Sequence, residues 1–226
     1  MPAKLMQPAV ESLEALLNQA RESQSWFQPK VQVFATATGG TTGPVGLKAD
    51  KANGSRPSAR AYQKAGEKGD FRYIKDMIRT SVSYPNCGAA ASALAMVTNH
   101  FTVVEAKDHF TQPKPGGYVD FNLIVVNPIN GHLCELQIHF DSMLHAKHHG
   151  GHKAYKVERA SSQGAKIRQM SDPKARARVQ RALWKGQSAY CKSRVGLHHD
   201  PDRQMMMTRF RQLEARARGN ASALVG

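Results

Sequence analysis

The chain is poor in cysteine and in acidic residues, and it lacks any long apolar run. Its three cysteines, Cys87, Cys134 and Cys191, are odd in number, far apart and without metal-ligand spacing. This usage is typical of a reducing compartment and excludes a disulfide framework. No run of 18 apolar residues is present, which excludes a membrane-spanning helix, so we expect no membrane partner.

The first residues lack the basic region, apolar stretch and small-residue cleavage site of a secretory signal. We therefore expect a cytoplasmic protein. A specialised secretion machine that delivers a protein into a recipient cell requires no such signal, so delivery of this kind stays open as an alternative.

Acidic residues are scarce beside basic ones: 17 Asp and Glu stand against 32 Lys and Arg, and the net charge is +15. Residues 1–150 carry 15 basic and 12 acidic residues, a net of +3, whereas residues 151–226 carry 17 and 5, a net of +12. A basic C-terminal third attracts polyanions such as nucleotide phosphates, RNA or an acidic partner. A solvated basic helix surface is the alternative.

The length and composition favour one α/β core, because 226 residues with 41% hydrophobic side chains suffice for a sizeable one. An Asn130-Gly131 turn signal predicts a hairpin between the last two strands. We expect an α+β fold, a mixed β-sheet flanked by helices. Periodicity predicts helices at 8–22, 56–79, 87–98, 141–160, 173–195 and 202–218, and strands at 78–84, 101–106, 118–127 and 132–140.

Residues 35–46 are rich in threonine and glycine, which predicts a flexible loop or linker. We therefore divide the chain at residue 50. Residues 1–50 are expected to form an N-terminal helix and a flexible segment, and residues 51–226 a catalytic domain whose basic C-terminal helices occupy residues 161–226. Within the last predicted helix, Met205 to Met207 and Phe210 are expected on the buried side.

The predicted strand at 132–140 alternates polar and apolar side chains. Glu135, Gln137 and His139 share one face, and Leu136 and Ile138 share the other. We expect the apolar pair in the core and the polar row facing solvent or a cleft. Taken alone, such a pattern is more commonly a half-exposed edge strand.

The preceding predicted strand adds Tyr118, Asp120 and Asn122 with the same period of two. Two adjacent strands then present a patch too polar for a core face. A patch of this composition suits a sugar–phosphate ligand together with Mg²⁺.

Four histidines, His145, His148, His149 and His152, are spaced i, i+3, i+4 and i+7, as on one helix face. Such a row can bind Zn²⁺. No cysteine or clustered carboxylate accompanies it, and Gly150-Gly151 would interrupt the helix. We therefore favour substrate contact over metal binding for this segment.

Five motifs follow one another between residues 56 and 160. They are a basic helix from Arg56 to Lys64, a segment from Asp76 to Arg79, the Gly117-Tyr118 strand, the Glu135-Leu136-Gln137-Ile138 strand and the His- and Lys-rich segment from His145 to Lys156. In this order and spacing they resemble the RelA/SpoT synthetase family. Three departures indicate a divergent, toxin- or effector-like branch: His139 stands where the common family has Arg, and Asp120 and Asn122 stand where it has Ser and His.

The resemblance implies a nucleotidyltransferase-like sheet and a pyrophosphokinase that uses Mg²⁺. It would transfer pyrophosphate from ATP to a ribose hydroxyl of a nucleotide, as (p)ppGpp- or (p)ppApp-type synthetases do. The acceptor stays open between GDP or GTP, an adenine nucleotide and the 3′ end of tRNA. A toxin of this kind would have an immunity or antitoxin protein as a partner. The remaining alternative is a non-catalytic nucleotide- or RNA-binding domain of the same fold.

The resemblance also assigns roles to individual residues. Asp76 and Glu135 would hold Mg²⁺, and Glu135 either completes that site or takes the proton from the attacking hydroxyl. Gln137 would hydrogen-bond the ribose or phosphate. ATP would contact Arg56, Arg60 and Lys64, spaced four apart as on one helical face, and Arg79. The acceptor would contact Tyr118 by stacking, Asn122, Lys107, His152, Lys153 and Lys156.

Overall fold

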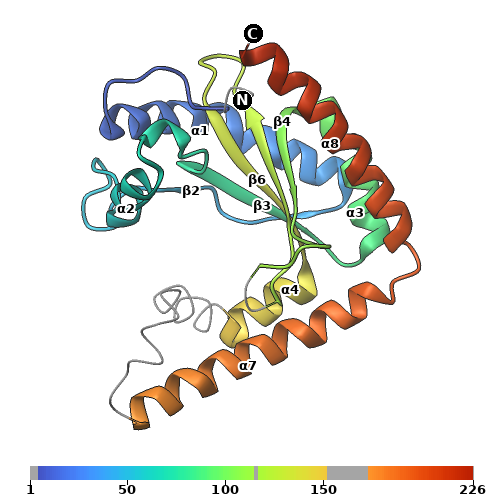
Figure 1. Ribbon diagram of the computed structural model, residues 1–226. Helices are drawn as coiled ribbons and strands as arrows, with labels where there is room; N and C mark the ends of the chain where they lie inside the picture. Colours follow the sequence, from blue (N-terminus) through green and yellow to red (C-terminus); the bar gives the residue numbers. More distant parts are fainter. Residues whose placement is uncertain (1–4, 115–116, 152–172, 226) are drawn as a thin grey trace.

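The computed structural model describes residues 5–114, 117–151 and 173–225 (Figure 1). Helices and strands are interspersed as far as β6, and helical elements follow. They are α1 (Leu13–Thr38), β1 (Thr41–Thr42), β2 (Gly46–Leu47), α2 (Ala59–Lys68), the 3₁₀ helix η1 (Phe71–Tyr73), β3 (Ile78–Tyr84), α3 (Cys87–His100), β4 (Thr102–Asp108), β5 (Phe121–Val126), β6 (Leu133–Phe140), α4 (Asp141–Ala146), the π-helical turn η3 (Lys147–Gly151), α7 (Pro173–His198) and α8 (Arg203–Val225).

The strands form one mixed sheet in the order β1-β3-β6-β5-β4, and β2 also pairs with β3. β3 and β6 are parallel, whereas β6, β5 and β4 are successively antiparallel. The β5–β6 pairing confirms the predicted hairpin. The expected α+β fold, a mixed sheet flanked by helices, is confirmed.

One face of the sheet carries the core. Every second side chain of β3 and β6 points to this face, and Val82, Leu136 and Ile138 on it are fully buried. α1 and α3 cover it, and Phe34 of α1 packs edge-on against Phe101 beside them (Figure 1). α8 packs along β4 and α3. The opposite face carries the polar side chains and, beside them, a smaller buried apolar cluster of Val104, Ile124 and Leu133.

The N-terminal segment belongs to the same core and sheet. Leu16, Leu17 and Phe27 of α1 are fully buried in it. The side chain of Gln7 donates to the carbonyl of Leu133, and its oxygen accepts from the Leu133 amide. The threonine- and glycine-rich stretch, expected as a flexible loop, contains β1 and β2, both paired with β3.

Several predicted helix limits were wrong. α1 continues to Thr38, because Phe34 and Ala35 keep a buried stripe beyond residue 22. The helix expected at 56–79 is α2 followed by η1; it begins after Ser58, whose side chain accepts from the Ala61 amide, and ends at Gly69 in the left-handed conformation.

In the C-terminal part, Met205 is 44% exposed, whereas Met206, Met207 and Phe210 are buried as expected. The helix expected at 141–160 is α4 followed by η3 up to Gly151, and its remainder lies outside the described residues. No described helix combines the length and apolar character needed to cross a membrane.

Gly40 offers a test of the packing between α1 and the sheet. A Cβ atom there would lie 2.8 Å from the buried Tyr84 ring and closer still to Val82. We predict that Gly40→Ala lowers the free energy of unfolding by about 1–3 kcal/mol, as overpacking does. Denaturant unfolding measures this. Gly66→Ala is the control, because no atom lies within 4 Å of its added Cβ, and equal stability of both variants would contradict the packing.

Candidate active site

The strand register brings charged and amide side chains together on the face opposite the core. Arg79 of β3 is paired with Glu135 of β6, and Asn122 of β5 with Gln137 of β6. Residues paired across neighbouring strands lie side by side on one face. A row of polar side chains therefore crosses the middle of the sheet.

This polar row is buried. Glu135 is 8% exposed, Asn122 7% and His139 0%. β6 lies between β3 and β5, so the alternative of a half-exposed edge strand is wrong. Buried polar groups are stable only when they have hydrogen-bond partners.

The partners form a chain along β6. The Tyr118 hydroxyl lies 2.7 Å from Nδ1 of His139, and Nε2 of His139 lies 3.0 Å from Oε1 of Gln137. Nε2 of Gln137 donates to Oε1 of Glu135 at 2.6 Å. Burial lowers the pKa of His139 to about 3, so its ring is neutral. Tyr118 thus lies on the Glu135 side of the sheet, as expected.

A second cluster surrounds Asp76, just before β3. Nζ of Lys48 and Nζ of Lys64 lie 2.7 and 2.6 Å from Oδ2 of this carboxylate. Burial would raise the pKa of Asp76, but the two ammonium groups outweigh burial and hold that pKa at about 2. Burial also lowers the pKa of the Lys48 ammonium, an effect that Asp76 opposes.

A third ionic group lies on β4. Glu105 contacts the ammonium groups of Lys75 and Lys107, the latter at 2.6 Å. Burial would raise the pKa of Glu105, but Lys107 and Lys75 together lower it. Since Glu105 is paired with Ile124 and Ile124 with Glu135, the group lies two strands away from Glu135 on the same face.

Asp120 anchors the segment between β4 and β5. Its fully buried carboxylate lies 2.6 Å from Nδ1 of His109 and 2.9 Å from Nζ of Lys114. Burial would raise the pKa of Asp120, but His109 and Lys114 lower it. Asp120 therefore supports the neighbouring Tyr118 by holding its loop.

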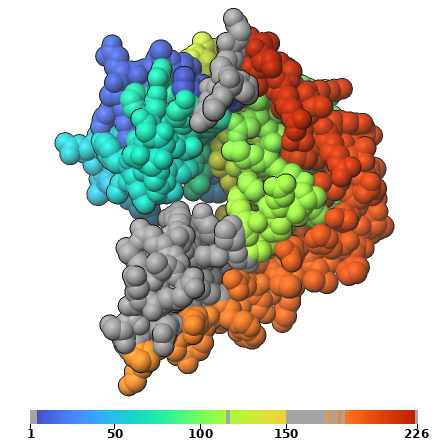
Figure 2. Space-filling view, viewed as in Figure 1, coloured from blue at the N-terminus to red at the C-terminus, as the bar shows by residue number. Residues whose placement is uncertain are grey.

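The ring of Tyr118 has neighbours from three directions. Tyr190 of α7 packs against it edge-to-face at 5.5 Å between centroids, and the ammonium groups of Lys114 and Lys147 lie 5.1 and 5.7 Å from its centre. The ring offers a face on which a planar group can stack, and the ammonium groups beside it would attract an anionic ligand. Figure 2 shows a hollow between the teal surface of α2 and the green surface of the β4–β5 segment.

Only some of the predicted ATP contacts lie at the polar site. Lys64 and Arg79 lie at the Asp76 cluster and on the polar face. Arg60 lies on α2, where it pairs with Glu67 at 2.9 Å. The expectation that Arg56 shares a helical face with them was wrong, because α2 begins at Ala59 and Arg56 lies in the turn before it.

The predicted acceptor contacts divide in the same way. The strand expected at 118–127 begins only at Phe121, so Tyr118 precedes β5 and its hydroxyl reaches the polar face through His139. Asn122 lies on that face, and Lys107 is paired with it across β4 and β5. His152, Lys153 and Lys156 lie outside the described residues.

The histidine segment shows no metal cluster where it is described. The rings of His145 and His149 stack at 3.9 Å, and Nδ1 of His149 lies 2.9 Å from the carbonyl oxygen of His145. Within residues 5–114, 117–151 and 173–225, no group of three or more His, Cys, Asp or Glu could hold a metal ion.

Sequence reasoning missed Lys48 and Lys147. Lys48 follows β2, just beyond the stretch expected to be a flexible loop, and no periodic signal marked it. Lys147 stood within the His-rich motif but was not singled out. Burial lowers the pKa of the Lys147 ammonium group, which also lies close enough to Arg79 and Glu135 for both to affect that pKa. Both lysines reach the site only through tertiary packing.

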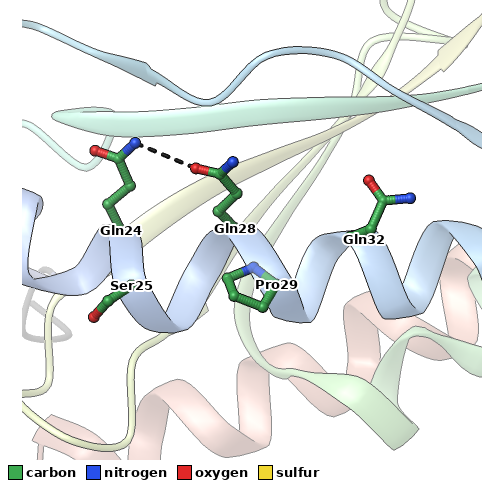
Figure 3. Close-up of a pocket in the computed structure, with 5 residues that line it drawn as sticks. All are labelled: Gln24, Ser25, Gln28, Pro29 and Gln32. Carbon is green, nitrogen blue, oxygen red and sulfur yellow. Dashed lines mark hydrogen bonds between the residues drawn. The ribbon is translucent and has the colours of Figure 1, made fainter.

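A separate depression of about 380 Å³ lies along α1 (Figure 3). Gln24, Gln28 and Gln32 follow one another on one side of the helix, and Gln24 donates to Gln28 at 3.3 Å. Ser25 and Pro29 complete its lining. It contains no ionisable side chain, so we assign it no part in the candidate active site.

Replacing Lys48 tests the Asp76 cluster. We predict that Lys48→Met raises the pKa of Asp76 above about 2, because burial remains while one compensating cation is lost. A carboxyl NMR titration measures this shift. Since the folded pKa is depressed, Asp76 stabilises the fold above its unfolded pKa of about 3.9. This contribution falls as pH drops towards about 2.

In Lys48→Met the contribution of Asp76 should still begin to fall near the unfolded pKa. The total loss should be smaller and complete at a higher pH than in the wild type, because the folded pKa lies closer to the unfolded one. Lys30→Met on α1 is the control and should leave the titration of Asp76 unchanged. An unchanged Asp76 titration in Lys48→Met would contradict the cluster.

The comparisons with known proteins show the fold. No family model matches the chain, and no curated protein matches it. The small alarmone synthetase 1 from Bacillus subtilis is 18% identical, with a TM-score of 0.54, over 79% of this chain and 92% of that chain. The small alarmone synthetase 2 from the same organism is 16% identical, with a TM-score of 0.52, over 80% and 96%.

A third similar structure is synthetase 1 bound to its product pppGpp, with 17% identity, a TM-score of 0.50 and coverage of 79% and 93%. The likeness extends over nearly the whole length of these proteins. The chain therefore has a RelA/SpoT-like synthetase fold, as the motifs in its sequence indicated.

Proposed function

We propose that this chain is a nucleotide pyrophosphokinase, which transfers pyrophosphate from ATP to a ribose hydroxyl of a nucleotide acceptor. One observation carries the proposal: in a fold shared with small alarmone synthetases, Arg79, Glu135 and Gln137 lie together on the polar face. The lysine-bound carboxylate of Asp76 precedes the same strand as Arg79.

The reaction makes one phosphorus–oxygen bond and breaks another. The acceptor hydroxyl oxygen attacks the β-phosphorus of ATP, the bond from that phosphorus to the oxygen bridging the α-phosphate breaks, and AMP leaves. Glu135 takes the hydroxyl proton, and Gln137, which donates to Oε1 of Glu135, orients that carboxylate.

The cations around the site would serve the phosphates of ATP. Phosphoryl transfer depends chiefly on alignment and on neutralising charge. Lys48 lies close enough to Asp76, Lys64 and Arg79 for all three to affect the pKa of its ammonium group. A triphosphate entering there would replace Asp76 as the partner of both ammonium groups.

Mg²⁺ fits this donor set. It prefers hard carboxylate oxygens, and Asp76 and Glu135 supply them from the segment before β3 and from β6. When bound, Mg²⁺ would neutralise charge on the transferring phosphates. Release of Asp76 from its lysines by ATP would free that carboxylate for the metal.

The acceptor has two candidate classes. GDP, GTP or an adenine nucleotide is the first, and synthetase 1 of Bacillus subtilis was solved with its product pppGpp. The 3′ end of tRNA, modified by a toxin, is the second. Exposed basic side chains on α7 and α8 and the 72% exposed Trp184 favour a long polyanion with stacking bases. The exposed basic residues include Arg181, Lys185, Lys192, Arg209, Arg211, Arg216 and Arg218.

An exchange assay with labelled ATP and separate acceptors tests the proposal. GDP, GTP, ATP and deacylated tRNA are each incubated with the protein and Mg²⁺, and products are separated by chromatography. We expect labelled pyrophosphate on one acceptor class and stoichiometric AMP. Absence of transfer to every acceptor would favour the non-catalytic binding domain.

Glu135→Gln is predicted to lower single-turnover transfer by about 10²-fold or more, because the amide cannot take the proton. Folding and ATP affinity should stay close to those of the wild type. Glu22→Gln, on the exposed side of α1, is the matched control. Near wild-type transfer by Glu135→Gln, with normal melting, would show that Glu135 is not the base.

ATP binding should depend on Mg²⁺ and on the Asp76 cluster. We predict by calorimetry that Lys64→Met weakens ATP binding by about 10-fold, since one charge-assisted contact is lost. Omission of Mg²⁺ should weaken binding further, and Lys30→Met should bind as the wild type does. Mg²⁺-independent binding of equal strength in folded protein would contradict the proposed metal site.

A further inference from the structure

We propose that His139 is a positioning residue that aligns Tyr118, Gln137 and Glu135, and so couples the acceptor site to the catalytic carboxylate. The inference rests on the proposed function and deepens it. His139 is fully buried on the polar face, and both of its ring nitrogens face a partner.

The donors and acceptors of this hydrogen-bonded chain allow only one direction for its hydrogen bonds. The Glu135 carboxylate only accepts hydrogen bonds, so the amide group that faces it must be the NH₂ of Gln137. The oxygen of Gln137 then faces His139 and can only accept, which places the ring proton on Nε2. Nδ1 of the neutral ring is left as an acceptor.

Tyr118 is the first donor of the hydrogen-bonded chain. Its hydroxyl lies 2.7 Å from Nδ1 and 3.2 Å from Nε2 of His139. The shorter contact joins a hydroxyl donor to the nitrogen that is free to accept. Each donor from Tyr118 to Glu135 therefore points towards the carboxylate, an arrangement in which neighbouring hydrogen bonds strengthen one another.

The surroundings of His139 keep its ring neutral and so preserve the direction of these hydrogen bonds. A protonated ring would offer N–H at both nitrogens and could no longer accept from Tyr118. Burial is the main factor that keeps the ring neutral. Of the charged groups nearby, Asp120 favours the protonated ring, while Lys147, Lys114 and Arg79 oppose it.

The hydrogen-bonded chain from Tyr118 to Glu135 has a direct consequence for catalysis. Without His139, the amide of Gln137 can rotate and present its oxygen to Glu135, and the Tyr118 hydroxyl loses its buried partner. His139 thus acts on the reaction through two other residues, one at the acceptor site and one beside the carboxylate. Its loss should affect both the acceptor KM and kcat.

The first test is the tautomer of His139 in the wild type. Imidazole nitrogen NMR on the full chain should show Nε2–H and an unprotonated, hydrogen-bonded Nδ1 between about pH 5 and 8, well above the pKa of about 3. An Nδ1–H tautomer, or a charged ring in this range, would overturn the proposal. This measurement needs no substrate, so it decides the arrangement even if pyrophosphate transfer is never detected.

The second test uses variants. His139→Phe keeps a planar ring but removes both nitrogens, and we expect about a 10- to 100-fold loss of kcat with a raised acceptor KM. ATP affinity should not change. A Gln side chain can present an amide N–H near the position of Nε2 and a carbonyl oxygen as acceptor, so His139→Gln should restore much of the loss. His199→Gln, exposed in the turn after α7, is the control.

A double-mutant cycle separates positioning from general destabilisation. Tyr118→Phe removes only the hydroxyl, and in the His139→Phe background it should have almost no further effect on acceptor KM. Additive effects, or near wild-type kinetics of His139→Phe, would overturn the proposal. If His139→Phe does not fold, the tautomer and the kinetics of His139→Gln and Tyr118→Phe decide instead. Absence of transfer by the wild type itself would count against the proposed function alone.

Discussion

The parallel pairing of β3 with β6 is the constraint on which the rest of the structure depends. It aligns two alternating strands, so that Val82 and Ile138 lie together in the core. The same register necessarily places Arg79 beside Glu135 on the other face. Since a shift by one residue would exchange the two faces, burial of the apolar set also fixes the position of the polar set.

The polar face is stable because its members satisfy one another. Glu135, Gln137, His139 and Tyr118 form one hydrogen-bonded chain, and Asp76 is compensated by Lys48 and Lys64. A buried polar group without a partner would cost about 1–3 kcal/mol. The arrangement is therefore preorganised for ligands of matching charge, and a triphosphate offers the charge that Asp76 now supplies.

The elements beyond the central strands shape the margins of the site. α2 carries Lys64 to Asp76, and α7 carries Tyr190 to Tyr118. The basic, exposed surfaces of α7 and α8 lie outside the sheet itself.

The sequence by itself determined the strands and their faces. The alternation in β3 and β6 and the Asn130-Gly131 turn are local signals, so the hairpin, the buried pair Leu136 and Ile138 and the polar row could be predicted. The ordered motifs indicated the fold. Only the tertiary structure decided that β6 is an interior strand, that Lys48 joins Asp76 and that His139 links Tyr118 to Gln137. These contacts join residues far apart in the chain or depend on side-chain rotamers and burial, and neither is encoded in local periodicity.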